Sequence, residues 1–264
     1  MRNTRYRFLV LLSSLLMLTG CSRRDILDDY PVSGVEISLD WNGVTNKLPE
    51  GVRVIFYPKN AEGRKIDTYL SVKGGKVKVP PGRYSVVVYN YDTETVQIRG
   101  EEAYETIEAF TGHCNGLGIA GTEQLVWGPD PLYVVRIDDL KIENSEEELQ
   151  LNWKPKLVVK TYSFKLKVQG LEYVSSIVGS IEGMSSCYDL GLGCGKAGDS
   201  PIYFAARGSA GEVTGSFTVF GTSEGVISRA GNAIKLTLAF VKTDNKVQKM
   251  EVDITEVIAN SESG

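Results

Sequence analysis

Apolar and polar side chains alternate along most of the chain after residue 34. The alternation is clearest from Val35 to Trp41 and is the pattern of a strand that buries one face. Further strand-like segments lie at 52–57, 69–72, 76–79, 132–137, 157–159, 162–168, 213–219, 234–240 and 247–254. Residues 84–89 are almost all apolar, so we expect this strand to lie centrally in its sheet. The pattern predicts a succession of short strands.

Turn residues separate these segments, whereas a helical period is scarce. Gly74-Gly75 and Pro80-Pro81-Gly82 each stand between two strand-like segments. Proline fixes φ and glycine permits positive φ, so both groups predict turns. Residues 243–246 predict a hairpin turn, and residues 101–109 fit a short helix or a strand equally well. Many short strands with turns between them are typical of β-sandwiches, and we therefore predict an all-β fold.

An acidic, polar stretch from Glu143 to Glu148 interrupts the alternation. It divides the body of the chain into two parts of about 115 residues each, which is a usual domain size. We predict a signal peptide at 1–20, a lipidated tether at 21–33, one β-sandwich at 34–148 and a second at 149–264.

The first residues carry the features of a bacterial lipoprotein signal. Arg2, Arg5 and Arg7 precede a run of 11 residues, 8–18, that is apolar except for two serines. A basic start, a short apolar stretch and small residues mark a secretory signal, and a membrane span would need roughly 20 apolar residues. Cys21 follows Leu-Thr-Gly and completes a lipobox. We predict acylation of the Cys21 thiol; an ordinary signal peptide or a short membrane anchor are the alternatives.

Cleavage before Cys21 would leave 244 of the 264 residues and remove three arginines, which changes the formal charge from −4 to −7. Several acyl chains give stable membrane anchoring, whereas one chain is marginal. We therefore expect an acidic, exported body that contacts the membrane through lipid on Cys21.

The composition excludes several classes of protein. The chain is 42% hydrophobic, too much for a disordered protein, and its charge of −4 gives no basic field for nucleic acid. A single histidine, His113, cannot build a histidine-rich metal site, and any histidine-dependent triad would have to include it. We expect no metal, no cofactor and no nucleic acid.

Two local features resemble reactive sites but lack the required context. Gly116–Gly121 matches G-x-G-x-x-G, yet the crossover helix of a dinucleotide site is missing, so we interpret it as a glycine-rich loop. Cys114 adjoins His113, but neighbouring side chains of an extended chain point apart. The sequence predicts neither a zinc site nor a thiol nucleophile here.

Cys187 and Cys194 are close enough in sequence for a small disulfide loop, which an exported protein could form. Cys114 would then remain as a buried free thiol. Trp127 lies in a loop before Gly128-Pro129 and is the best candidate for an exposed aromatic side chain. Acidic pairs such as Asp138-Asp139 could serve a glycoside hydrolase only if two carboxylates converged in a cleft, and the sequence gives no sign of that.

Several segments together resemble a known family. They are the lipobox and residues 35–41, 53–58, 79–90, 132–134, 162–171, 183–184 and 214–221. The chain resembles the FimB-like fimbrial-anchor lipoproteins of Bacteroidetes, and especially an uncharacterised lipoprotein branch beside them. This resemblance covers most of the mature chain and implies two transthyretin-like β-sandwich domains in tandem.

The resemblance also implies a role at the base of a surface fimbria. Lipid on Cys21 would hold the protein in the outer membrane, facing the cell exterior, and a sandwich would accept a strand from the next subunit. Polymerising relatives are thought to be freed by cleavage after an arginine near the first strand. Here Arg23 and Arg24 lie so close to Cys21 that such a cut would discard the anchor. This departure favours an anchor or accessory subunit.

We therefore expect a non-enzymatic outer-membrane lipoprotein that binds fimbrial or other surface subunits by β-strand addition. The alternative is a glycan-binding lipoprotein of a nutrient-capture system, which would show a rim of exposed aromatic residues, with Trp127 among the candidates. A hydrolase on the same scaffold would need an acidic pocket. The sequence does not identify which sheet edge binds the partner.

Overall fold

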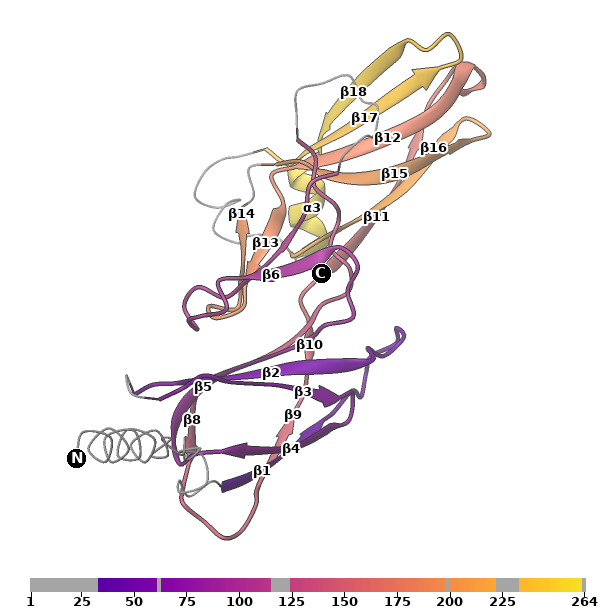
Figure 1. Ribbon diagram of the computed structural model, residues 1–264. Coiled ribbons are helices and arrows are strands. Elements are labelled where there is room, and N and C mark those ends of the chain that lie inside the picture. The colour runs from indigo at the N-terminus through magenta and orange to yellow at the C-terminus, as the bar shows by residue number, and fades with distance from the viewer. Residues whose placement is uncertain (1–32, 61–62, 115–123, 198–199, 222–232, 263–264) are drawn as a thin grey trace, which may run out of the picture.

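The computed structural model describes residues 33–60, 63–114, 124–197, 200–221 and 233–262, and these residues form three β-sheets (Figure 1). The predicted all-β fold is confirmed. An eight-stranded sheet lies at one end of the molecule and a six-stranded sheet at the other, with a four-stranded sheet between them. Cys21 and the glycine-rich segment 116–121 lie outside the described residues.

The eight-stranded sheet has the order β10-β8-β5-β2-β3-β4-β1-β9. All of its strand pairs are antiparallel except β1–β9, which is parallel. Its strands are β1 (Ser33–Leu39), β2 (Gly51–Pro58), β3 (Ile66–Ser71), β4 (Gly74–Val79), β5 (Gly82–Asn90), β8 (Tyr133–Ile142), β9 (Leu149–Trp153) and β10 (Lys156–Leu157). Strand β5 lies between β2 and β8, which is the central place that its apolar sequence predicts.

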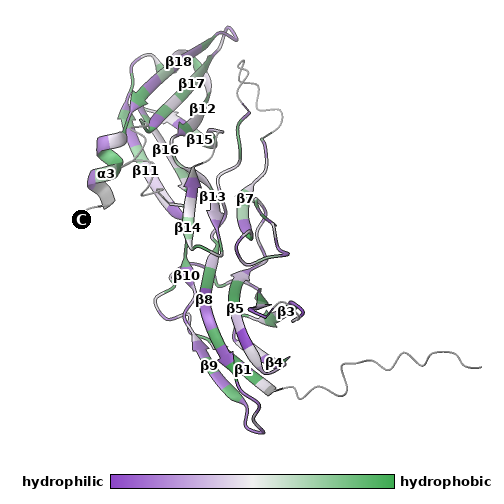
Figure 2. Ribbon diagram, turned by 90° about the vertical axis from the view of Figure 1, so that its left-hand side faces the viewer, coloured by the Kyte–Doolittle hydropathy of each residue, from purple (hydrophilic) through white to green (hydrophobic). Residues whose placement is uncertain are grey.

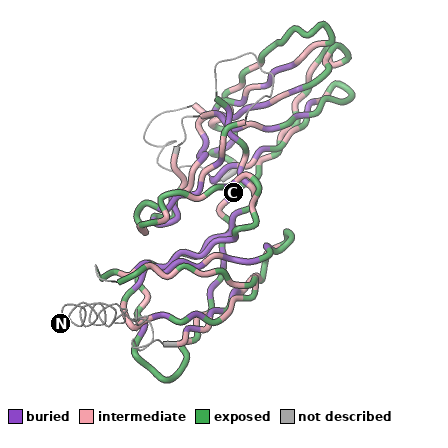
Figure 3. The backbone as a smooth tube through the Cα atoms, in the orientation of Figure 1, coloured by how far each residue is buried: buried purple, intermediate pink, exposed green. Residues whose placement is uncertain are grey.

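The sheet curls around a core that takes side chains from β1, β2, β4, β5, β8 and β9, among them Val35, Phe56 and Val86. The opposite face of β2 and β5 is buried too, because Ile55 and Val87 belong to a second core that includes residues of the four-stranded sheet. Burial on both faces explains why β5 reads as a continuous apolar run. Figure 3 shows these two strands as the mostly purple segments in the lower half of the molecule.

The six-stranded sheet is antiparallel throughout and has the order β11-β16-β15-β12-β17-β18. Its strands are β11 (Lys160–Lys167), β12 (Val174–Glu182), β15 (Ile202–Ser209), β16 (Glu212–Val219), β17 (Lys235–Lys242) and β18 (Val247–Asp253). A 3-10 helix, η2 (Leu171–Tyr173), precedes β12, and a C-terminal helix, α3 (Thr255–Glu262), follows β18. The predicted hairpin at 243–246 is present, with Asn245 at a φ of 63°. The predicted strand-like pattern ends at residue 254, and no helix was predicted after it.

The four-stranded sheet has the order β14-β13-β7-β6 and joins distant parts of the chain. Its strands are β6 (Val96–Arg99), β7 (Glu108–Thr111), β13 (Ser185–Asp189) and β14 (Cys194–Ala197). β7 pairs with β13, so Phe110 lies opposite Cys187. Within 101–109, which fitted a helix or a strand, turns occupy most of the segment and β7 begins at Glu108.

This arrangement corrects the boundary that we expected after residue 148. Strand β9 pairs with β1 and strand β10 pairs with β8, so the first sheet extends to Leu157. The acidic stretch 143–148 is a loop between two strands of one sheet, since solvated charge marks a loop without saying which sheet follows it. In Figure 2, green and purple residues alternate along β8, which precedes this loop.

Among the described helices none is long and apolar enough to cross a membrane.

Candidate functional site

The six-stranded sheet bends so that side chains from all of its strands meet in one core. Val213 of β16 and Leu238 of β17 are both fully buried in the same cluster, although their strands are not neighbours. A flat sheet could not enclose both. Figure 1 shows the two layers, with β12, β17 and β18 above β15, β16 and β11. Because the sheet bends at its middle, its two edge strands, β11 and β18, both border this core.

We call the border between these edge strands the open seam and define it by Phe164, Leu166, Met250 and Ile254. These apolar side chains are half-buried and pack against the core, whereas the corresponding positions of the inner strands are buried. Phe164 lies opposite Gly215 of β16. Its ring occupies the space that a side chain at position 215 would need, because a Cβ built on Gly215 would lie 2.6 Å from the ring. Its ring also meets Phe204 edge-to-face at 5.5 Å. The core therefore reaches the seam as a continuous apolar surface.

One end of the open seam is closed by helix α3. Ile258 of this helix is 4% exposed and belongs to the core. The Asp253 carboxylate accepts hydrogen bonds from the backbone N–H and the hydroxyl of Thr255, which lowers the pKa of Asp253 and fixes the start of the helix. The Thr255 hydroxyl accepts a bond from the Ile234 N–H at 2.7 Å, which ties the helix to β17.

A hollow of about 930 Å³ lies at the tip of the sheet, beside the end of β11. It is lined by residues 167–172, which begin at the last residue of β11. Residues 208–212, at the turn that joins β15 to β16, line its other side. The tip turn contains Ala210 at a φ of 50° followed by Gly211 at 79°.

The chemistry of the open seam suits an extended peptide. An edge strand presents unpaired backbone N–H and C=O groups, and a half-buried apolar row beside it can take every second side chain of an added strand. Lysines on the solvent face of the edge strands, Lys165, Lys167 and Lys249, are exposed and discourage unselective pairing. The ammonium group of Lys165 forms an ion pair with the carboxylate of Glu212 at 2.8 Å.

The sequence identified the alternation in β11 but did not identify the seam. Phe164 and Leu166 are apolar positions of the predicted strand at 162–168. The pattern of a single strand does not indicate whether that strand lies at the edge of its sheet. Met250 carries no signal of its own. Only the order of the strands brings β11 and β18 to the two edges of one bent sheet.

His113 and Cys114 are adjacent, and their backbone pairs with the segment at Leu125 and Val126. His113 forms an isolated bridge with Val126, and the N–H of Cys114 donates to the Leu125 carbonyl at 2.8 Å. Burial raises the pKa of the Cys114 thiol to about 11, so it is protonated at neutral pH. In the described part of the chain, no three His, Cys, Asp or Glu side chains gather as a metal-binding group.

Cys187 and Cys194 are free thiols, so the disulfide that their spacing allowed is not formed. The register explains this: Cys187 lies opposite Lys196, while Cys194 lies opposite Asp189. The two cysteines are therefore diagonal neighbours, with Cα atoms about 7–8 Å apart in a regular sheet, whereas a disulfide needs less than about 7 Å.

Trp127 is 38% exposed, and its ring meets Tyr203 edge-to-face at 5.4 Å. The two rings are nearly perpendicular, at 89°, so this pair is not a flat platform. The pair Tyr69 and Tyr91, both exposed and 5.3 Å apart, lies on the eight-stranded sheet instead.

Comparison with known proteins places the chain among relatives from Bacteroides. The family model described as a domain of unknown function, DUF5119, matches residues 20–205. A protein of Bacteroides ovatus, named as a proposed fimbrium anchoring subunit, Fim4B, is 63% identical over all of this chain and 83% of its own length.

Solved structures share the fold. A proposed adhesin of Bacteroides ovatus is 59% identical, with a TM-score of 0.83 over 92% of this chain and 89% of that one. The fimbrial anchor protein Mfa2 of Porphyromonas gingivalis is 11% identical, with a TM-score of 0.53 over 88% and 85%, and this shows a common fold alone. The resemblance to fimbrial-anchor lipoproteins is confirmed, and the chain belongs to the DUF5119 family.

Proposed function

We propose that this protein is a fimbrial anchoring or accessory subunit that binds a partner subunit by β-strand addition at the open seam. The kinship with a relative named as a fimbrium anchoring subunit supports the role. The observation that carries the mechanism is the row of half-buried apolar side chains at the two edges of the six-stranded sheet. The added strand would place apolar side chains into the seam and pair its backbone with an edge strand.

The N-terminal sheet is the part of the molecule that would stay with the membrane. Its first described strand, β1, lies between β4 and β9, and Val35 and Ile37 are at most 1% exposed. Removing β1 would open the eight-stranded sheet and uncover its core, at a cost of about 1.5–3 kcal/mol for each large side chain lost. A subunit that keeps this strand has its own first sheet filled, and the open seam of the second sheet is then the place that we propose for a partner.

Substitution of the seam tests this role. Leu166→Asp and Met250→Asp each place a charge where an apolar side chain of the partner would lie, and we expect fimbrial subunits to be lost from the protein purified from outer membranes. Arg207→Asp on the same sheet is the matched control, because Arg207 is exposed and lies on strand β15 away from both edges.

A charge in a half-buried position can also destabilise the sheet, so a second readout is needed. A photo-crosslinking amino acid at position 166 or 250 should yield an adduct with a fimbrial subunit, whereas the same group at position 207 should not. Adducts from position 207 alone, or full recovery of subunits by both aspartate variants, would rule out the seam.

We further propose that lipid on Cys21 holds the protein at the outer membrane with its body toward the cell exterior. The lipobox and the charge of the preceding segment support this. Cys21→Ala should abolish palmitate labelling and membrane partitioning, while Cys114→Ala should leave both unchanged. Label that persists in Cys21→Ala would refute lipidation. The proposal includes no enzymatic activity.

A further inference from the structure

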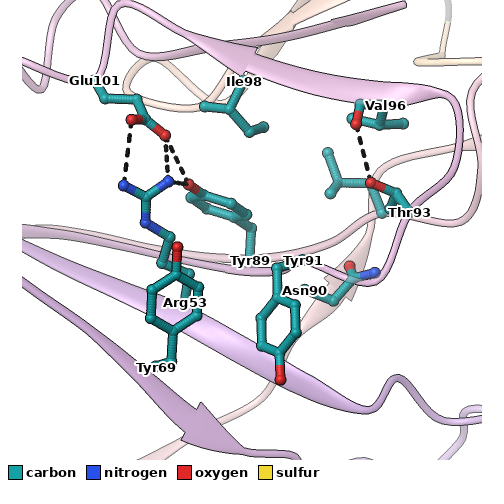
Figure 4. A pocket seen from close by; sticks show the side chains of 10 residues that line it. Arg53, Tyr69, Tyr89, Asn90, Tyr91, Thr93, Val96, Ile98 and Glu101 are labelled. Atoms are coloured by element: carbon teal, nitrogen blue, oxygen red, sulfur yellow. Dashed lines mark hydrogen bonds and ion pairs between the residues drawn. The ribbon is translucent and has the colours of Figure 1, made fainter.

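A second concave site lies on the eight-stranded sheet, away from the seam. It has a volume of about 250 Å³, and its lining includes Arg53, Tyr69, Tyr89, Tyr91, Ile98 and Glu101. These six residues come from β2, β3, β5 and β6 and from the loops that follow β5 and β6. Figure 4 shows Arg53, Tyr89 and Glu101 converging, with the rings of Tyr69 and Tyr91 side by side next to them. We call this the tyrosine pocket.

The register of three strands builds the wall of the tyrosine pocket. Arg53 of β2 lies opposite Tyr69 of β3 and opposite Tyr89 of β5. Tyr91 lies over Gly51, where an ideal Cβ would come within 2.7 Å of its hydroxyl. The absence of a side chain at Gly51 therefore makes room for the second exposed ring.

The Arg53 guanidinium has no donor left for a ligand. Its Nε and Nη2 donate to Asp67 at 2.9 and 2.7 Å, and Nη2 also reaches Glu101 at 3.2 Å. Its Nη1 donates to the Tyr89 hydroxyl at 2.8 Å and to Glu101. These contacts use all five N–H donors of the group. Arg53 is a fixed support for the pocket.

The charges around the tyrosine pocket exclude ionic ligands. An anion would meet the carboxylates of Asp67 and Glu101 and find no free guanidinium donor. A cation would meet the positive charge of Arg53 itself, whose guanidinium lies 5.6 and 5.9 Å from the ring centroids of Tyr69 and Tyr89 and covers one face of each ring. What remains is a neutral ligand with both an apolar face and hydroxyl groups.

Two rings remain available for such a ligand. Tyr69 is 60% exposed and Tyr91 is 45% exposed, and they meet edge-to-face at 5.3 Å. Each offers an apolar ring and a hydroxyl that both donates and accepts, and Oε2 of Glu101 keeps one lone pair beyond those that Arg53 and Tyr89 use. Exposed tyrosine gives contact area at a low cost in conformational entropy.

From these observations we propose that the tyrosine pocket binds a neutral sugar residue of a surface glycan. One C–H face of a pyranose would lie on the face of the Tyr69 ring that Arg53 does not cover. One of its hydroxyls would donate to Oε2 of Glu101, and others would exchange hydrogen bonds with the hydroxyls of Tyr69 and Tyr91. The pocket is small, so one sugar unit is recognised. This site is independent of the subunit contact at the seam.

The test uses the full-length chain in detergent on an array of neutral and acidic glycans. Saturation-transfer NMR with the methyl glycosides of glucose, galactose, mannose and N-acetylglucosamine then follows. We expect binding of neutral glycans, weakened about tenfold or more by Tyr69→Ala and Tyr91→Ala. Tyr69→Phe, which keeps the ring, should stay within about threefold. Tyr173→Ala is the matched control, because Tyr173 is 63% exposed and lies on the other sheet.

Three results would overturn the proposal. They are an array on which no glycan binds, binding restricted to acidic glycans, and binding that survives both alanine variants. Both tyrosines are exposed, so unchanged melting temperatures are expected, and they separate loss of the site from loss of the fold. Leu166→Asp should leave sugar binding intact, which distinguishes a failure here from a failure at the seam.

Discussion

The ammonium group of Lys196 lies 2.9 Å from the carboxylate of Glu108, a residue that precedes it by 88 positions. The same ammonium lies 2.9 Å from Asp189, and Arg99 pairs with the other oxygen of Glu108. Each of these four residues lies on a different strand of the four-stranded sheet, which we call the central sheet because it lies between the other two. The sheet that joins the two halves of the chain is therefore held by a charge network as well as by backbone pairing.

Removing the ammonium from this network should destabilise the central sheet. Lys196→Met keeps the length of the side chain but leaves two carboxylates short of a partner, and their side chains are only 10% and 2% exposed. We expect a loss of about 2 kcal/mol in the free energy of unfolding, measured by urea titration. Lys165→Met removes an exposed pair, with side chains 62% and 37% exposed, and should cost about 0.5 kcal/mol or less. Equal effects of the two variants would contradict this account.

The network should also make the free energy of unfolding depend on pH. Burial alone would raise the pKa of Glu108, but the hydrogen bonds from Lys196 and Arg99 outweigh it and keep the pKa below its ordinary value. A carboxyl group of this kind stabilises the fold above its unfolded pKa, roughly 4.3, and the stabilisation is lost as the pH falls through the folded pKa.

The stability advantage of the wild type over Glu108→Gln should therefore be full at neutral pH and shrink in acid, below about pH 4. Unfolding titrations at several pH values measure this difference. Glu143→Gln serves as the control. Lys141 also lowers the pKa of Glu143, but both side chains are 70% exposed, so solvent screens this pair and the difference from the wild type should be small at every pH. An advantage that does not change with pH would show that the carboxylate is not the stabilising form.

Gly179 is required by the packing of the six-stranded sheet. It lies opposite Phe204, and an ideal Cβ would come within 2.0 Å of that ring. Gly179→Ala should cost about 1–3 kcal/mol through overpacking. In Gly179→Ala with Phe204→Leu, the combined loss should be smaller than the sum of the single losses, because the clash is relieved. Gly112→Ala is the control, since its nearest neighbour is the end of the flexible Gln97 side chain at 3.3 Å.

The three cysteines of the described chain should all react as free thiols, at different rates. Cys194 is exposed and should be alkylated by iodoacetamide first, without prior reduction. Cys114 should react slowly at pH 8, because burial raises its pKa to about 11 and the thiolate is the reactive form. Peptide mass spectrometry reads the order. Protection of both Cys187 and Cys194 until a reductant is added would show a disulfide in the exported protein.

The sequence by itself determined which segments extend and which face of each is buried. The alternation in β1, β11 and β18 and the continuous apolar run of β5 were sufficient, because a period of two fixes the side of the strand on which each residue lies. The alternation did not predict short or serine-rich strands such as β7, β12 and β13, because their apolar residues are too few to define a period of two.

Only the tertiary structure decided which strands are neighbours. The parallel pairing of β9 with β1, the central sheet built from both halves of the chain and the placement of β11 and β18 at the edges join residues far apart in sequence. The tyrosine pocket has the same origin, because Arg53, Tyr69 and Tyr89 meet through the register of three strands. Periodicity describes one strand at a time, whereas pairing is selected by the packing of the whole core.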